Sequence, residues 1–131
     1  MRTGRCLCGA VRYALSGGPF IVLECHCSMC RRESGAASLV YAGYRRTEVV
    51  MSGSLKYYRA SAKARRGFCP SCGSPVSYED DGQADVIWLT AGTHDDAGSL
   101  PSREYVYVSD KLSWVELAQN IPQWPGERGI N

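Results

Sequence analysis

The sequence predicts a mostly β protein with little helix, and three observations support this prediction. Short segments alternate apolar and polar residues, as at Val11, Tyr13 and Leu15, which is the period of a strand with one buried face. Turn-forming sequences separate these segments, and the chain contains 14 glycines and 6 prolines. Only two stretches, 27–34 and 112–120, have the composition of short helices.

The expected strands follow one another closely along the chain, with turns between them. No repeat, low-complexity tract or linker divides the 131 residues, so we expect a single domain over residues 1–131. The strands are expected at 9–15, at 20–25, at 36–44, within 47–59 with a turn at Ser52-Gly53, within 74–92 as a hairpin with Asp81-Gly82 at its tip, and at 103–109.

The N-terminal residues and the composition favour a cytoplasmic protein that does not enter membranes. The segment MRTGRCLCGAV lacks the apolar core of a secretory signal, and no apolar run approaches the ~20 residues that span a bilayer. The formal net charge is +2, and it would turn slightly negative if all the cysteines bound two zinc ions as thiolates. We therefore expect no nucleic-acid partner.

The seven cysteines are grouped in a way that favours metal binding. Their number is odd, and nothing indicates the secreted setting in which disulfide frameworks occur. A thioredoxin-like redox pair would be expected to open an amphipathic helix, and none is visible at the last pair. The cysteines form the clusters Cys6-x-Cys8, Cys25-x-Cys27-x-x-Cys30 and Cys69-x-x-Cys72.

Two of these clusters are pairs that together supply four thiolates. In a strand, Cys6 and Cys8 would point in the same direction. The segment Cys69-Pro70-Ser71-Cys72-Gly73 is a zinc-knuckle pattern, in which Gly73 permits a tight turn. Four thiolates are typical of structural zinc. Spacing alone leaves open whether Cys25 and Cys27 pair with the knuckle instead.

The third cluster supplies three thiolates, which is the number of protein ligands that a catalytic zinc keeps. The fourth position would hold water or a substrate atom. A side chain could complete the site instead, and His26 lies between two of the cysteines. Strand alternation predicts that His26 points away from the metal, and His94, beside Asp95 and Asp96, is expected in a polar turn.

The motifs GRCLCGAVRY, CHCSMCRRESG and GFCPSCGSPV, in this order, resemble those of the glutathione-dependent formaldehyde-activating enzyme family. The segment WVELAQNIPQWP is also similar to the C-terminal end of that family. The resemblance implies the β-tent fold, in which several small curled antiparallel sheets are stabilised by zinc. It further implies two zinc ions per chain, a structural one at Cys6, Cys8, Cys69 and Cys72 and an active-site one at Cys25, Cys27 and Cys30.

The activity implied by this resemblance is that of a carbon–sulfur lyase acting on an adduct of a thiol and an aldehyde. The family's named reaction joins glutathione to formaldehyde, so small thiols and aldehydes are the expected partners. The same fold also serves proteins that bind partners without catalysis. A zinc-stabilised binding module is therefore the alternative, and the ligand at the fourth position of the second zinc distinguishes the two. Oligomeric state is not predicted.

Possible substrate contacts are Arg31 and Arg32, which follow the third cysteine of the cluster, and His26. Arginine suits a substrate carboxylate, but cations near thiolate clusters are also favourable through charge balance alone.

Other cations and aromatic residues have simpler interpretations. Lys63, Arg65 and Arg66 are interpreted mainly as charge balance near the knuckle. The three tryptophans could line a pocket, but core packing is the preferred interpretation for Trp88, Trp114 and Trp124.

Overall fold

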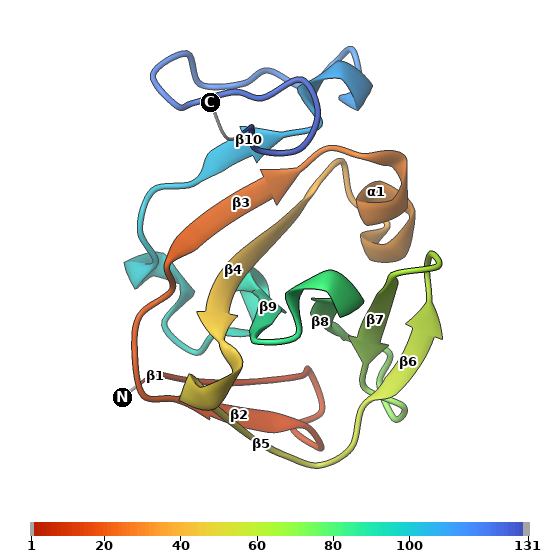
Figure 1. Ribbon diagram of the computed structural model, residues 1–131, viewed down its shortest axis with the longest axis vertical. Coiled ribbons are helices and arrows are strands. Elements are labelled where there is room, and N and C mark those ends of the chain that lie inside the picture. Colours follow the sequence, from red (N-terminus) through yellow and green to blue (C-terminus); the bar gives the residue numbers. More distant parts are fainter. Residues whose placement is uncertain (1, 130–131) are drawn as a thin grey trace.

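The computed structural model describes residues 2–129, and its strands form two sheets with one short α-helix (Figure 1). The smaller sheet is antiparallel in the order β1-β2-β5 and lies at the lower end of the view. Its strands are β1 (Arg2–Arg5), β2 (Arg12–Leu15) and β5 (Val49–Ser52).

The larger sheet has seven strands in the order β10-β3-β4-β9-β8-β7-β6. It curls from β10 at the top of Figure 1 to the β6–β7 hairpin at the right. Its strands are β3 (Ile21–Cys25), β4 (Leu39–Arg45), β6 (Lys56–Arg59), β7 (Ala64–Phe68), β8 (Pro75–Asp80), β9 (Val86–Thr90) and β10 (Glu104–Val106).

The helical elements are short. The α-helix α1 (Ser28–Ser34) follows β3 and confirms the expectation of one or two helical turns in 27–34. No helix within residues 2–129 has the length and apolar character needed to cross a membrane. The 3₁₀ turns are η1 (Arg46–Glu48), η2 (Asp81–Gln83), η3 (Ala91–Thr93), η4 (Ala97–Ser99) and η5 (Val108–Asp110).

The mostly β class is confirmed, but the larger sheet is not purely antiparallel. Strand β10 pairs with β3 in parallel, with Tyr105 opposite Glu24. Since β9 and β3 are both antiparallel to β4, strand β10 also runs in the same direction as β9. The connection between β9 and β10 must therefore cross back over two strands, and the 3₁₀ turns η3 and η4 lie within it.

The hairpin expected in 74–92 is confirmed, since β8 pairs with β9 and η2 forms its tip. The stretch 47–59 is divided between the two sheets, because β5 pairs with β2 and β6 pairs with β7. Strands β1 and β7 lie outside every stretch predicted to be extended. Each contains two arginines and one glycine, which have little preference for strands, so their pairing is decided by neighbouring strands.

The helix predicted over 112–120 is wrong. The described chain there is irregular, and a turn is closed from Val115 N–H to the Leu112 carbonyl. Its path brings the following segment alongside β10, where the N–H of Trp124 donates to the carbonyl of Tyr105 at 2.9 Å. Trp114 is 71% exposed, so its predicted place in the core is also wrong.

The main core lies between the two sheets. Val11, Tyr13 and Leu15 are buried on one face of the chain around β2, as the alternation predicts. The further buried members of this cluster are Cys6, Val22, Ala42, Tyr44, Cys69, Val76, Ile87 and Leu89.

A buried histidine links the sheets through hydrogen bonds. His94 Nε2 lies 2.7 Å from the hydroxyl of Tyr44 on β4, and Nδ1 lies 3.2 Å from the hydroxyl of Tyr13 on β2. The turn expected beside His94 is present at Asp95 and Asp96, but the His94 side chain itself is buried and only 5% exposed. Two tyrosine hydroxyls and nearby carbonyls satisfy the ring, which allows it to be buried.

We predict that protonation of His94 destabilises the fold. Burial lowers the pKa of His94 below its usual value of 6.5, so the unfolded chain binds this proton more readily. The stabilisation is complete above pH ~6.5 and is lost as the pH falls below that value. Urea unfolding from about pH 7.5 to about pH 5.5 should show this loss, and His94→Gln should reduce the slope.

The cysteines titrate equally in the wild type and in His94→Gln. The difference between the two proteins in how the free energy of unfolding changes with pH therefore reports on His94 alone. An unchanged slope in His94→Gln would show that other groups carry the pH dependence.

Candidate metal centres and the adjoining cavity

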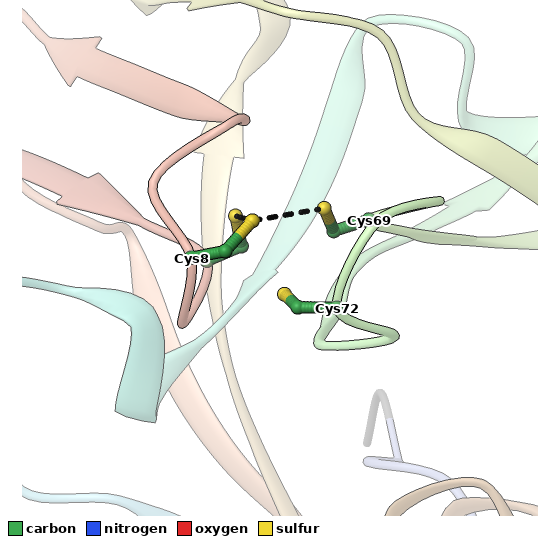
Figure 2. A group of neighbouring side chains, drawn as sticks. Cys8, Cys69 and Cys72 are labelled. Atoms are coloured by element: carbon green, nitrogen blue, oxygen red, sulfur yellow. Dashed lines mark hydrogen bonds between the residues drawn. The ribbon is translucent and has the colours of Figure 1, made fainter.

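Four cysteines from two loops that are far apart in the sequence lie close together. Figure 2 shows Cys8, Cys69 and Cys72 projecting toward one another from two separate loops. Cys6 completes the group, and the four sulfur atoms all lie within 4.8 Å of one another. The structure thus joins the first cysteine pair to the last, which is the pairing that the family resemblance implies.

Cys6 and Cys8 lie on the turn between β1 and β2 and not on a strand. The strand expected at 9–15 begins only at Arg12, where this turn ends. Strand β1 ends at Arg5, and the N–H of Cys6 donates to the Val11 carbonyl at 3.0 Å. Gly9 in this turn has a φ of 83°, a conformation that favours glycine.

The second loop closes in a similar way. The N–H of Gly73 donates to the Cys69 carbonyl at 2.8 Å, and Gly73 has a φ of 79°. The hydroxyl and backbone of Ser74 also stabilise Cys72 Sγ as a thiolate. Hydrogen bonds from Ser74, first from its hydroxyl, lower the pKa of Cys72 to about 5. Both loops are therefore knuckles that direct two sulfurs to a shared point.

The sulfur separations fit a metal ion. A tetrahedral zinc with Zn–S bonds of about 2.3 Å holds its sulfurs about 3.8 Å apart. The distance from Cys6 Sγ to Cys8 Sγ is 3.7 Å, and that from Cys8 Sγ to Cys69 Sγ is 3.8 Å. Disulfide sulfurs would lie about 2 Å apart, so these cysteines are thiols. The four cysteines could hold one metal ion in a closed site.

The remaining three cysteines form a second cluster where β3 meets α1. Cys25 is the last residue of β3, Cys27 is the N-cap of α1, and Cys30 lies buried in the first turns of the helix. The N–H of Cys30 donates to Cys27 Sγ at 3.3 Å. The three sulfur atoms lie within 4.8 Å of one another and could hold a second ion.

The contacts within this cluster favour a negative charge on the sulfur of Cys27. Hydrogen bonds from the thiols of Cys25 and Cys30 lower the pKa of Cys27 to about 2. The same contacts raise the pKa of Cys25, because the two groups compete for one proton. The contacts thus favour the thiolate of Cys27 over that of Cys25, and thiolates are the form that binds metals.

Among residues 2–129, no fourth histidine, cysteine, aspartate or glutamate ligand atom joins this group. His26 is fully buried on the far side of the backbone, with Nε2 3.0 Å from Glu24 Oε2. Its ring packs edge-on against Tyr105. Strand alternation therefore predicted the direction of His26 correctly.

A cavity of about 560 Å³ adjoins the three cysteines. Cys25, Cys27 and Cys30 all line it, so the cluster faces open space on one side. The side chains of Arg31 and His26 are not among the lining residues, and Arg32 lines a neighbouring hollow. Trp88 forms part of the cavity wall, and Trp124 packs behind the cysteine cluster.

Arg66 on β7 is the basic residue that the structure places at the cluster. It is only 5% exposed, and its Nη1 and Nη2 atoms each lie 3.6 Å from Cys30 Sγ. Burial alone would lower the pKa of Arg66, but Tyr41, Cys30 and Glu33 together raise it, so the guanidinium stays charged.

Glu33 of α1 completes this arrangement. Its Oε1 atom accepts from Arg66 Nη1 at 2.5 Å and from the Tyr41 hydroxyl at 3.1 Å. The sequence analysis interpreted Arg66 mainly as charge balance near the Cys69–Cys72 knuckle, but the structure places it at the three-cysteine cluster, because β7 was not recognised as a strand. Had 64–68 been treated as a strand, alternation would have placed Arg66 on the same face as the buried Ala64.

Two further tyrosines, Tyr78 and Tyr107, line the cavity. Burial raises the pKa of Tyr78, and Asp80 adds to the effect. Burial likewise raises the pKa of Tyr107, with a contribution from Glu127. Both phenols therefore keep their protons at neutral pH. Tyr107 has a φ of 56°, the one positive φ among the described non-glycine residues, and such strain is often found at functional sites.

A mostly β fold with one cluster of four thiols and one of three defines a cysteine-rich protein with two groups of side chains that could each hold a metal ion. The sequence model of the glutathione-dependent formaldehyde-activating enzyme family matches residues 1–110, and the chain belongs to this family. The resemblance seen in the three cysteine motifs is thus confirmed. The segment WVELAQNIPQWP lies beyond the matched residues.

A solved structure also shares the fold. The crystal structure of a Rhodobacter sphaeroides protein, determined in a structural genomics programme, superposes with a TM-score of 0.59 at 21% sequence identity. The similarity covers 93% of this chain and 98% of that chain. No curated protein matches the chain with significant sequence similarity.

We predict that the two clusters differ in their effect on stability. The four-thiol group joins residues as far apart as Cys8 and Cys69, 61 positions apart, whereas the three-thiol group lies within six positions. Cross-links that close long loops stabilise most. Cys69→Ser should therefore unfold the protein or make it insoluble, and Cys27→Ser should retain the fold and lose one of two metal ions by elemental analysis. Equal losses of melting temperature would contradict this difference.

We predict that Arg66→Gln weakens both the fold and the retention of the second ion. The substitution leaves Glu33 without its buried partner, which typically costs about 3 kcal/mol. It also removes the cation beside Cys30, so a chelator should take one of two ions more readily. Arg65→Gln is the matched control, because Arg65 is 40% exposed and the loss should stay below about 1 kcal/mol.

Urea unfolding and the kinetics of metal release to a chelator measure the two effects. Equal behaviour of the two variants would show that Arg66 is not a specific partner of the cluster.

Proposed function

We propose that this protein is a zinc-dependent enzyme of the carbon–sulfur lyase type that acts on the adduct of a thiol and an aldehyde. The observation that carries the proposal is the three-cysteine cluster, which opens on a cavity of about 560 Å³ without a fourth ligand from residues 2–129. Membership of the formaldehyde-activating family supports the same reaction class.

Two zinc ions per chain are proposed, with different roles. The closed group of four cysteines would hold a structural ion, because no position is left for a substrate. Cys25, Cys27 and Cys30 would hold the ion of the active site. Zinc at this second site would supply a Lewis acid and a position at which a thiol loses its proton readily.

The reaction needs no oxidant. Addition of a thiol to formaldehyde forms a carbon–sulfur bond and moves the carbonyl π electrons to oxygen, while the thiol loses one proton and that oxygen gains one. A phenol that protonates the oxygen is restored by the proton that the thiol gave up. The reverse reaction breaks the same bond and returns the proton. Tyr78 and Tyr107 are the protonated phenols that line the cavity, and we propose them as candidates to donate at the oxygen.

Arg66 is proposed as a positioning residue and not as a substrate contact. Its guanidinium is already engaged with Glu33 and Cys30, so its positive charge offsets the thiolates and fixes α1 against β7. The proposed contacts from Arg31, Arg32 and His26 have less support, because none of these residues lines the cavity at the cysteines.

We also propose a reducing, cytoplasmic setting. All seven cysteines are free thiols, and both clusters need them in that form. Reducing compartments preserve such thiols.

The test is a binding and turnover experiment on zinc-loaded protein. We expect a small thiol to bind with release of a proton, and to form its hydroxymethyl adduct with formaldehyde faster than in buffer. Calorimetry in buffers of different ionisation enthalpy measures the proton, and NMR measures the adduct. Both signals should vanish in Cys27→Ser, which should still fold.

The alternative of a non-catalytic binding module makes the opposite prediction. X-ray absorption that finds a fourth protein ligand on the second zinc, with no binding of any thiol, would overturn the enzyme proposal. Adduct formation that persists in Cys27→Ser would place the chemistry elsewhere.

A further inference from the structure

We propose that the thiol taken by this site carries an uncharged, apolar substituent and is not a charged peptide such as glutathione. The inference rests on the proposed function, because it assigns the substrate class of the same cavity.

One wall of the cavity is aromatic. Phe20 and Trp88 meet edge to face, with ring centroids 5.5 Å apart and an interplanar angle of 67°. Gly43 on β4 makes room for them, because a Cβ atom there would lie 2.7 Å from Phe20 and 2.8 Å from Trp88. The rings therefore lie directly on the backbone of the sheet, and this wall depends on a residue without a side chain.

The remaining surface near the cysteines is largely aliphatic. Leu23, Met29 and Val106 line the cavity beside the sulfur cluster. Phe20 is 56% exposed and Met29 is 48% exposed, so part of the apolar surface that lines the cavity is left open to water. A substituent that removes this surface from water gains binding free energy in proportion to the apolar area buried.

The two cations at the cavity are already neutralised. Arg66 Nη1 lies 2.5 Å from Glu33 Oε1, and Arg128 Nε lies 3.0 Å from Glu104 Oε1. A ligand carboxylate would have to compete with these carboxylates for the arginines. Glutathione carries two carboxylates, whereas Arg66 is buried against Glu33 and Arg128 is already paired with Glu104 through Nε.

The other charged groups at the cavity are acidic. Asp80 and Glu127 line it, and three thiolates around one zinc would add a further net negative charge. A ligand with net negative charge is therefore repelled, and an uncharged ligand is not. Glu127 and Arg128 also lie beyond the residues 1–110 that match the family, so this rim is contributed by the chain outside the matched region.

The test compares three thiols by calorimetry on zinc-loaded protein at one pH and moderate ionic strength. Benzyl mercaptan presents an aromatic substituent, 2-mercaptoethanol a small neutral one, and glutathione a charged one. We expect benzyl mercaptan to bind at least about ten-fold more tightly than 2-mercaptoethanol, and glutathione to bind more weakly than either.

Variants separate the two causes of the expected order of affinities, which are apolar contact with the aromatic wall and repulsion of negative charge. Trp88→Ala removes half of the aromatic wall and should reduce the preference for benzyl mercaptan several-fold. Trp114→Ala is the matched control, because Trp114 is 71% exposed and does not line the cavity. Glu127→Gln removes an exposed acidic charge without burying anything, and should raise the affinity for glutathione alone.

The outcomes distinguish this inference from the proposed function. If glutathione binds most tightly, or if Trp88→Ala and Trp114→Ala leave the same order of affinities, the apolar substrate class is wrong and the enzyme proposal stands. If no thiol binds while both zinc ions are present, both proposals fail. Tight binding of benzyl mercaptan that depends on Trp88 supports the inference, independently of any measured turnover.

Discussion

The meeting of Cys6 and Cys8 with Cys69 and Cys72 is the constraint on which the rest of the structure depends. It joins the turn between β1 and β2 to the turn between β7 and β8, so the small sheet is held against the far half of the large sheet. The buried contacts from His94 to Tyr13 and Tyr44 link the same two sheets at a second point.

The second cluster depends on this frame in a less direct way. Its three cysteines are close in sequence and would approach one another wherever β3 leads into α1. What the fold adds is the surroundings. Strand β7 brings Arg66 beneath Cys30, and β10 with the segment beside it closes the cavity with Val106 and Tyr107. The three cysteines therefore lie in a cavity that has the charged Arg66 beside them and apolar residues around them.

Sequence patterns predicted those features that depend on neighbours along the chain. Period-two alternation located β2, an apolar run located β3, and a hairpin pattern located β9. The direction of His26 followed from strand alternation. The alternation rule failed for Cys6 and Cys8, which lie on a turn, although the conclusion that their sulfurs share one space holds. The helix predicted over 112–120 was wrong for a different reason, because contacts with β10 override a weak helical composition.

The sequence by itself determined the mostly β class, the three cysteine motifs and the family, because each of these is recorded in short-range spacing. Spacing left open which pairs of cysteines meet, and the structure shows the pairing that the family resemblance implies. The tertiary structure alone decided the parallel pairing of β10 and the place of Arg66. It also decided that Phe20 and Trp88 pack together over Gly43. Such contacts join residues far apart in the chain, and their free energies depend on burial and charge that no local pattern contains.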